Sequence, residues 1–429
     1  MNSSTMKSNA KTVRIALPLL IAMPTFMLFR GWPILEHEWL TMLLFFVFMT
    51  LYTPSFLKSK LFIMIIVYEG IVLLNYISTD GYFTQLSDVY LEFMRLFLPI
   101  SATYYLLKRN DKKAMTYILI VFFALVVESA IASFIIDSSN PGIIRFIVGI
   151  TNGHRDITAY KPLFRLGLCD YILPHGLPIL IPSLFLGISN KNIATRYRIT
   201  IVIVLLCVLL LSYISGATTA VLLSVIVVIT MLFVRRASIK RNVAVFTIIS
   251  LISMPLLTNT NNIIKVLDLT QEVVAYGVYK NKILEIKNSI IYSEAEGDVG
   301  DRYDLYMYSI DALVNNFFLG TNENLGGHAS LVDRFATLGV IGFIPLIVIF
   351  VFYIKMVLRY IKQYDRNIQF YYYVGCAVFL LLVSFKSMLQ WEVCIVMFTI
   401  FPISIVILGQ KQVNDYSKYI YPLKSTKNE

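Results

Sequence analysis

The sequence predicts an all-α polytopic membrane protein with about twelve transmembrane helices and two long extracytoplasmic loops. Of its 429 residues, 57% are hydrophobic and 15% are charged, whereas about 25% of an ordinary soluble domain is charged. Apolar stretches of about 17 to 25 residues, the length that a helix needs to cross a bilayer, recur from residue 15 to residue 409. No remaining stretch is long enough for a soluble catalytic domain, so we expect residues 1–429 to form a single integral membrane domain.

The candidate spans follow one another along the chain. We place them at 15–31, 39–57, 61–78, 91–107, 114–136, 171–188, 199–215, 217–234, 242–258, 335–355, 369–386 and 389–409. The run 199–234 has small and polar residues at its middle, among them Ser215 and Gly216, and it forms two short helices or one broken helix. Lys7, Lys11 and Arg14 precede the first span and no small-residue cleavage site follows it, so we expect this span to be retained.

The positions of the basic residues predict the orientation of the spans. The chain has 37 Lys and Arg against 26 Asp and Glu, and most of the basic residues flank apolar runs. Assigning alternate connections to the cytoplasm places the majority of them on that side, as the positive-inside rule requires. Both ends of the chain are therefore expected in the cytoplasm, and the long connections 137–170 and 259–334 are expected to face outward. The net charge of +11 thus reflects topology, and nucleic-acid binding is not indicated.

The first outer loop, 137–170, is unusually basic for its predicted side. It contains Arg145, His154, Arg155, Lys161 and Arg165, although outer loops are normally poor in Lys and Arg. An anionic ligand would account for this cluster. A solvated surface is the alternative, because long loops escape the positive-inside rule.

The second outer loop, 259–334, contains an amphipathic helix near 301–319. Apolar residues recur there at helical spacing, Asp301 and Asp304 suit the start of the helix, and Gly320 suits its end. We expect this helix to lie on the membrane surface or across the mouth of the bundle. A further helix is expected to begin near 327–328 and to run through Asp333 and Arg334 into the span 335–355.

Three residues of the outer loops could carry chemistry. His328 follows a Gly- and Asn-rich turn at the start of a helix, where the helix dipole disfavours imidazolium, so a neutral ring could act as a general base. The alternative is that His328 only caps the helix. Arg302 has the planar, permanently charged fork that binds a diphosphate, and Arg165 offers a second such group. Either arginine could instead be solvated.

Few charges lie inside the predicted spans. Glu69, Arg95 and Glu128 are the clearest, with Lys386 and Glu392 near span ends. Such residues would suit the path of an ion-coupled transporter. Alternatively, Arg95 pairs with Glu69 or Glu128 and holds the bundle together, which is the interpretation we favour.

The sequence contains no recognisable metal or cofactor motif. The four cysteines, Cys169, Cys207, Cys376 and Cys394, are scattered singly and indicate neither a zinc site nor a disulfide framework. Nothing in the sequence matches a P-loop, an HExxH motif or a Ser/His/Asp series. We therefore expect no cofactor and no metal.

Several of these segments together resemble a known family. The stretch from Arg302 to Gly320, followed by Gly-His-Ala-Ser-Leu-Val-Asp-Arg-Phe-Ala-Thr-Leu-Gly-Val-Ile-Gly at 327–342, resembles the signature of bacterial O-antigen and capsule repeat-unit polymerases (Wzy) and of the related O-antigen ligases. Phe-Arg-Leu-Gly-Leu at 164–168 and Ser-Gly-Ala-Thr-Thr at 215–219 are similar to further parts of that pattern. The resemblance implies a GT-C-like membrane glycosyltransferase that uses no metal and no nucleotide sugar. It also implies a location in the bacterial inner membrane.

The resemblance implies roles for individual residues. Undecaprenyl-pyrophosphate-linked oligosaccharide would be both donor and acceptor, and Arg165 and Arg302 would hold the pyrophosphate leaving group. His328 would take the proton from the attacking sugar hydroxyl. Substrate would also contact four further residues, namely Arg155, Lys161, Asp333 and Arg334. Membrane lipids surround the protein, and a separate chain-length regulator is a further implied partner.

Two alternative functions remain open. An O-antigen ligase would transfer the finished chain to lipid A–core, and departures from the ligase-like pattern favour the polymerase. A lipid-linked oligosaccharide flippase would also be basic and have about twelve spans, but it should show two similar halves with short loops. This chain instead concentrates its polar groups in the loops 137–170 and 259–334.

Overall fold

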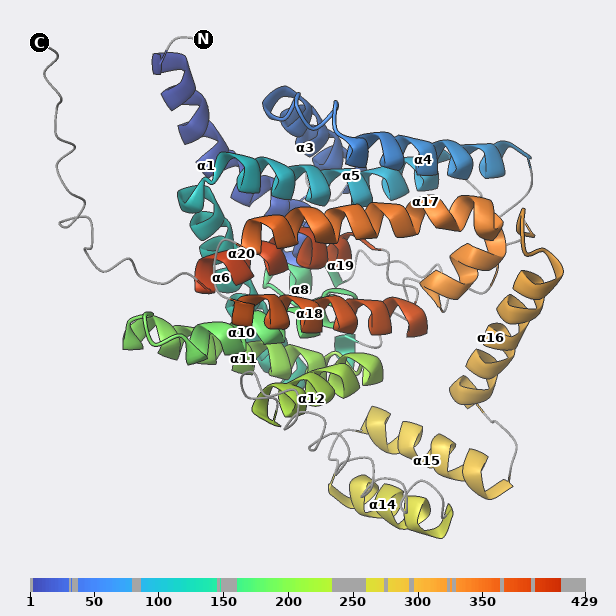
Figure 1. Ribbon diagram of the computed structural model, residues 1–429. Coiled ribbons are helices and arrows are strands. Elements are labelled where there is room, and N and C mark those ends of the chain that lie inside the picture. The colour runs from blue at the N-terminus through green and yellow to red at the C-terminus, as the bar shows by residue number, and fades with distance from the viewer. Residues whose placement is uncertain are drawn as a thin grey trace, which may run out of the picture.

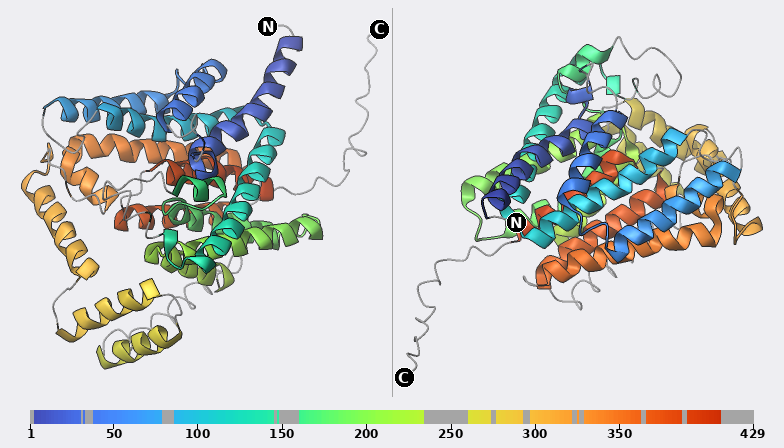
Figure 2. Two further views of the ribbon diagram at one scale, coloured as in Figure 1. Left: turned by 180° about the vertical axis from the view of Figure 1, so that it is seen from behind. Right: turned by 90° about the horizontal axis from the view of Figure 1, so that it is seen from above.

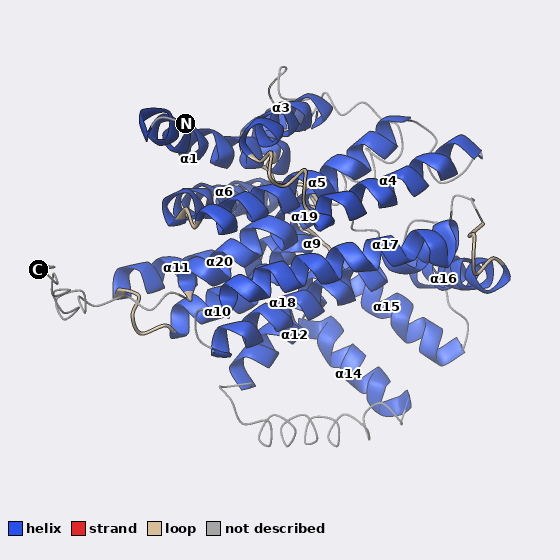
Figure 3. Ribbon diagram, turned by 45° about the horizontal axis from the view of Figure 1, so that its top comes forward, coloured by secondary structure: helices blue, strands red, loops and turns tan. Residues whose placement is uncertain are grey.

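A computed structural model describes most of the chain. It covers residues 3–30, 32, 38–78, 86–144, 147, 160–233, 260–273, 277–292, 297–321, 325, 329–362, 366–386 and 390–409. Within these ranges the regular structure is entirely helical, and no strand occurs (Figure 3). The expected all-α membrane fold is confirmed at this level.

The helices are labelled in Figure 1. The first group comprises α1 (Ser3–Thr25), α2 (Met27–Arg30), α3 (Glu38–Tyr52), α4 (Lys60–Ser78), α5 (Leu86–Arg109) and α6 (Lys112–Ser139). The second comprises α8 (Lys161–Arg165), α9 (Leu173–Gly176), the 3-10 helix η2 (Leu177–Leu180), α10 (Ile181–Ser189), α11 (Thr195–Ile214) and α12 (Thr218–Phe233). The third comprises α14 (Thr260–Val273), α15 (Gly277–Tyr292), α16 (Gly297–Asn315), α17 (Ser330–Ile361), α18 (Arg366–Phe385), α19 (Trp391–Ile395), the π-helix η3 (Val396–Ile400) and α20 (Phe401–Leu408).

Several helices have the length and composition of membrane spans. In the described chain, the five that qualify are Lys112–Ser139, Thr195–Ile214, Ser330–Ile361, Ile368–Phe385 and Trp391–Leu408. Shorter apolar helices cover Trp39–Tyr52, Leu173–Ser189 and Thr218–Phe233. The other predicted stretches also contain helix, except for 242–258, which lies outside the described residues. These apolar helices indicate a membrane-embedded protein.

The stretch 199–234 forms two helices rather than one broken helix. Helix α11 ends at Ile214 and α12 begins at Thr218. Between them Gly216 has a φ of 67°, a left-handed conformation that glycine adopts without strain. The chain therefore turns back at this glycine, and α11 and α12 pack against each other.

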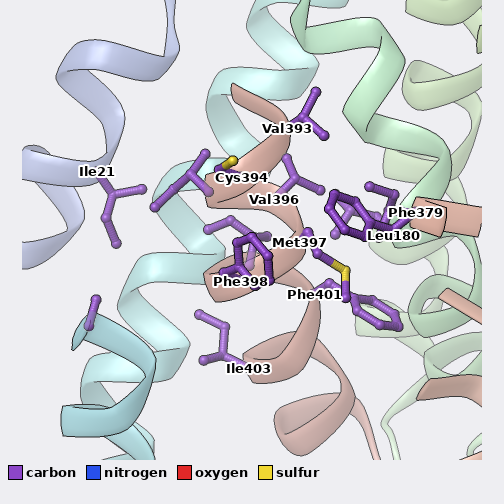
Figure 4. Packing of buried hydrophobic residues seen from close by; sticks show 14 of the residues in the cluster. Ile21, Leu180, Phe379, Val393, Cys394, Val396, Met397, Phe398, Phe401 and Ile403 are labelled. Carbon is purple, nitrogen blue, oxygen red and sulfur yellow. The ribbon is translucent and has the colours of Figure 1, made fainter. Parts of the chain in front are cut away.

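The segment from α19 through η3 to α20 lies at the centre of the bundle. It contacts α1, α5, α6, α10 and α18, and nearly all of Trp391–Leu408 is buried. Figure 4 shows Met397, Phe398 and Phe401 of this segment packed among buried side chains of surrounding helices. The segment is apolar on every side, which is the pattern of a helix enclosed by protein.

A proline explains the irregular turn inside this central segment. Pro402 has no N–H to donate to the carbonyl of Phe398, four residues earlier. That carbonyl instead accepts hydrogen bonds from the hydroxyl of Tyr353 at 2.6 Å and from the hydroxyl of Thr103. Side chains of α17 and α5 therefore satisfy the backbone at the π-helix, and they join three helices at one point.

The predicted amphipathic helix is α16, at Gly297–Asn315. It stands steeply against the end of the bundle formed by α4 and α17 (Figures 1 and 2). It begins and ends about four residues earlier than the predicted range 301–319. Helices α14 and α15, which pack on each other in the same long connection 259–334, were not predicted from the sequence.

Helix α17 begins at Ser330 and is kinked at Gly339. That glycine has φ 61° and ψ −173°, which no helix accommodates. Around it the chain packs on the turn after α16, because Val340 N–H bonds to the Phe317 carbonyl at 2.9 Å and Thr321 N–H bonds to the Ala336 carbonyl at 3.0 Å. A side chain on Gly339 would lie 2.3 Å from a backbone oxygen of this turn. Two crossing backbones thus meet where only glycine fits.

Candidate functional site

The structure describes some of the predicted site residues. Arg155 and His328 lie outside the described residues, and so does the side chain of Arg302, whose backbone belongs to the early part of α16. Arg165, Lys161, Asp333 and Arg334 are described in full. The first pair belongs to α8 and the second to the start of α17.

Arg165 ends the short helix α8 and is exposed. Its guanidinium carbon lies 5.8 Å from the ring centroid of Trp32, which places the cation over an aromatic face. Lys161 begins the same helix and is partly buried. Two residues after Arg165, Gly167 has a φ of 89°, and a β-carbon there would lie 1.9 Å from a carboxylate oxygen of Glu128. The Arg-Leu-Gly sequence therefore leaves room for a carboxylate of α6.

Asp333 anchors α16 to α17. Its carboxylate accepts a hydrogen bond from Ser309 Oγ on α16 at 2.8 Å and another from the backbone N–H of Ala329 at 2.8 Å. The second contact caps the start of α17, where an acidic group also suits the helix dipole. Asp333 is 2% exposed. In this structure it positions the helix that bears Arg302, and its contact with substrate stays a prediction.

Arg334 belongs to a buried network with Tyr68 and Glu92, which we call the Glu92 network. The Arg334 guanidinium pairs with one carboxylate oxygen of Glu92, and Tyr68 donates a hydrogen bond to the other at 2.8 Å. The side chains of Arg334 and Glu92 are 6% and 4% exposed. The network joins α4, α5 and α17 in the bundle interior.

Glu69 lies beside this network. It is 8% exposed, and neither of its carboxylate oxygens has a hydrogen-bond partner among the described residues. The charges of Glu92 and Arg334 are close enough to act on it. Arg95 does not pair with Glu69 or Glu128 within the described residues, so the expected pairing is wrong. Arg334 instead forms a buried ion pair of this bundle with Glu92. It lies one turn inside α17, at the end of the stretch 259–334 that the sequence assigned to an outer loop.

A second group of buried ionisable side chains comes from segments far apart in the chain. We call Asp170, His175, Lys386 and Glu392 the polar cluster, and each is at most 8% exposed. Asp170 caps α9 by accepting the N–H groups of Ile172 and Leu173.

Tyr171 connects members of this polar cluster. Its ring lies 5.6 Å from Lys386 Nζ and packs edge-on against the His175 ring at a centroid distance of 4.8 Å. Its carbonyl oxygen lies 2.9 Å from His175 Nδ1. Asp170 and Glu392 are both close enough to Cys169 for their charges to act on it. Glu392 therefore lies near this group as well.

The polar cluster and the start of α17 lie at the same end of the bundle. The backbone N–H of Ser330 bonds to the Lys386 carbonyl at 3.1 Å, which joins the start of α17 to the end of α18. Tyr306 of α16 donates to the Ser384 carbonyl at 2.7 Å. The stretch of chain that contains Arg302 and His328 is thus attached through Tyr306 and Ser330 to an end rich in buried charge. Charged side chains inside a membrane protein are costly and usually functional.

The chemistry available at this end is polar and ionic. Within the described ranges, no group of three or more His, Cys, Asp or Glu residues is placed to hold a metal ion. Lys386 and Arg334 can stabilise negative charge, while the carboxylates and His175 can accept protons. These groups suit reactions in which a proton is taken and an anionic group leaves.

Several of these residues were not predicted from the sequence. Glu92 stands three residues before Arg95 in an otherwise apolar run, a spacing that places both on one side of a helix. Asp170 and His175 flank the start of an apolar stretch with prolines, which is typical of a span with an irregular end. Glu92, Asp170 and His175 have in common that each is an ionisable residue next to a predicted span boundary.

No protein-family model matches this sequence, and no curated protein matches it either. The assignment of function therefore rests on the residues and their arrangement.

Proposed function

We propose that the protein is an integral-membrane glycosyltransferase that polymerises undecaprenyl-pyrophosphate-linked repeat units into O antigen or capsule. The proposed location is the outer face of the bacterial inner membrane, with both chain ends in the cytoplasm and a GT-C-like bundle of about twelve spans. The observation that carries the proposal is the attachment of the segment containing Arg302 and His328 to the bundle end that holds the polar cluster.

In the proposed reaction, the hydroxyl of the acceptor sugar attacks the anomeric carbon of the donor. The bond from that carbon to the pyrophosphate oxygen breaks, and the electron pair leaves with the pyrophosphate. Arg302 and Arg165 would stabilise this growing negative charge with paired N–H donors. His328 would accept the proton of the hydroxyl as the new bond forms. The step balances without a metal or a cofactor.

The described contacts support this scheme through positioning. Asp333 fixes α16 against the start of α17, so it sets where the early part of α16, with Arg302, lies relative to the segment before Ser330. Arg334 fixes the same start of α17 to α4 and α5. Preorganised groups of this kind reduce the cost of assembling the transition state. Arg155 and Lys161 would contact the glycan or the pyrophosphate from the first loop.

The test is a gel profile of surface polysaccharide from a deletion strain complemented with single variants. Wild type should restore a long ladder, whereas His328→Ala and Arg302→Ala should leave a single repeat on the normal acceptor. Arg196→Ala serves as the control, because the guanidinium of this exposed arginine bonds to and stacks on its sequence neighbour Tyr197. An unchanged ladder with His328→Ala and Arg302→Ala would contradict the proposed site.

The same experiment separates the alternatives. Long chains that remain on the carrier lipid would indicate an O-antigen ligase. Loss of all surface glycan, with lipid-linked repeats retained inside, would indicate a flippase. Glu69 gives the flippase a specific observation in its favour, because a buried intramembrane carboxylate suits ion-coupled transport. In a transporter Glu69→Gln should abolish function and Arg302→Ala should be tolerated, and the polymerase predicts the reverse.

A further inference from the structure

A groove lies between α4, α5 and α17, well away from the polar cluster. It has a volume of about 320 Å³ and is lined by Lys60, Leu61, Tyr104, Phe352, Lys355, Met356 and Arg359. Lys60 begins α4, while Lys355 and Arg359 lie in the last turns of α17. These two helices pack side by side and in opposite directions (Figures 1 and 2). The groove therefore lies at the bundle end predicted to be cytoplasmic.

Among the described residues, the lining of the groove includes cations and no acidic side chain. Lys60, Lys355 and Arg359 are exposed, and none of them forms an ion pair within the described part of the chain. A fourth cation, Lys108, lies next to the groove, where its Nζ bonds to the Tyr104 hydroxyl at 3.1 Å. The nearby Asp111 is already bound to Arg14 at 3.1 Å. An anion that enters the groove would therefore meet several uncompensated cations.

Apolar stripes lead from these cations along both helices. On α4, Ile63 and Val67 follow Lys60 on the same face and are 54% and 44% exposed. On α17, Ile347 and Val351 precede Lys355 at four-residue spacing and are 36% and 39% exposed. In a membrane-embedded bundle such exposed aliphatic side chains face lipid. The charged groove thus continues directly into a surface suited to acyl chains.

We propose that this groove binds an anionic glycerophospholipid of the surrounding membrane. The phosphate would sit among Lys60, Lys355 and Arg359, with the Tyr104 hydroxyl as a further donor. The acyl chains would lie along the stripes of α4 and α17. Basic pockets between transmembrane helices on the cytoplasmic side are suited to such headgroups. A lipid, rather than free phosphate, is specified because the groove continues into apolar stripes that suit acyl chains.

Bound lipid would connect α4 and α17 at one end of the pair, and the Glu92 network joins the same two helices further along. Tyr68 lies one residue after Val67 on α4, and Arg334 lies in the second turn of the same α17 whose last turns line the groove. The proposal does not depend on the enzymatic activity proposed above. It requires only that the protein is embedded in a bilayer.

The experiment is native mass spectrometry of the purified full-length protein in detergent, titrated with phosphatidylglycerol or phosphatidylcholine. Wild type should retain phosphatidylglycerol in preference to phosphatidylcholine. Combined replacement Lys60→Gln, Lys355→Gln and Arg359→Gln should weaken phosphatidylglycerol binding on the order of tenfold or more, since each cation near an anionic headgroup contributes a comparable attraction. Single Lys355→Gln should give an intermediate loss, which preserves the test if the triple variant does not fold.

A matched control removes three cations elsewhere on the same predicted side. Lys191→Gln, Arg196→Gln and Arg198→Gln change the charge equally but lie outside the groove, with Lys191 in the turn before α11 and the two arginines in its first turn. This variant should bind phosphatidylglycerol as wild type does, and excess inorganic phosphate should not displace the lipid. Equal losses in both triple variants would show a general charge effect and overturn the proposal. Displacement by inorganic phosphate would overturn the choice of a lipid.

Discussion

The Glu92 network allows a quantitative test of how the bundle is held together. Replacing Arg334 by Met removes the cation from Glu92 but leaves its carboxylate buried at 4% exposure, with the second carboxylate of Glu69 nearby. Breaking a buried ion pair from one side costs about 3–5 kcal/mol, because the remaining charge is uncompensated. We expect Arg334→Met to lower the free energy of unfolding by that amount.

A double-mutant cycle assigns the loss to the charge. In Arg334→Met combined with Glu92→Gln, the amide oxygen still accepts the Tyr68 hydrogen bond, but no carboxylate is left without a cation at this position. The double variant should therefore be more stable than Arg334→Met alone, with a coupling energy of about 2–3 kcal/mol. The measurement is the free energy of unfolding of purified protein in mixed micelles, titrated with a denaturing detergent and followed by circular dichroism.

A second ion pair of the same chain is the control. Arg14 pairs with Asp111 at 3.1 Å, but its side chain is 33% exposed. Such pairs contribute about 1 kcal/mol or less, so Arg14→Met should be much milder than Arg334→Met. Losses of Arg334→Met and Glu92→Gln that add to within about 0.5 kcal/mol in the double variant would refute the reasoning.

Three further predictions concern backbone contacts and are checked by unfolding of the purified variants. Gly339→Ala should destabilise by several kcal/mol or prevent folding, because its side chain would lie 2.3 Å from a backbone oxygen at a positive φ, whereas Gly70→Ala, with nothing within 4 Å, should be neutral or slightly stabilising. Equal effects of the two would contradict the contact. Tyr353→Phe should cost about 1–2 kcal/mol, because the Phe398 carbonyl loses a donor, and an unchanged stability would show that Thr103 suffices. Asp333→Ala should cost about 1–3 kcal/mol, since it leaves the first turn of α17 uncapped and Ser309 without its acceptor, and a loss below this range would contradict its anchoring role.

The helical fold was accessible from the sequence because the membrane imposes a length and an apolar composition on each span. The same rule located the turn at Ser215 and Gly216, where small residues interrupt an apolar run. Helices α14 and α15 were missed, because their mixed polar sequences lack the long apolar signal of a span. The kink at Gly339 was also missed, since it depends on a contact with a turn some twenty residues earlier in the chain.

The candidate site was less accessible for a related reason. Periodicity places a residue on a face of its own helix but does not identify the helix that faces it. The partner of Arg334, Glu92, lies 242 residues away along the chain and was therefore not predicted. The pairing expected for Arg95 failed in the same way. For Asp333, the sequence predicted the position near the start of a helix but not the contact with Ser309.

The central position of the α19–η3–α20 segment constrains how the protein assembles. This segment follows every other described helix in the chain, so a ribosome completes it after the helices that enclose it. Before the segment is inserted, Phe350, Phe379 and the other side chains that pack on Phe398 lack this contact. The earlier helices are therefore only loosely associated in the bilayer at that stage, and the bundle compacts after this segment has been inserted.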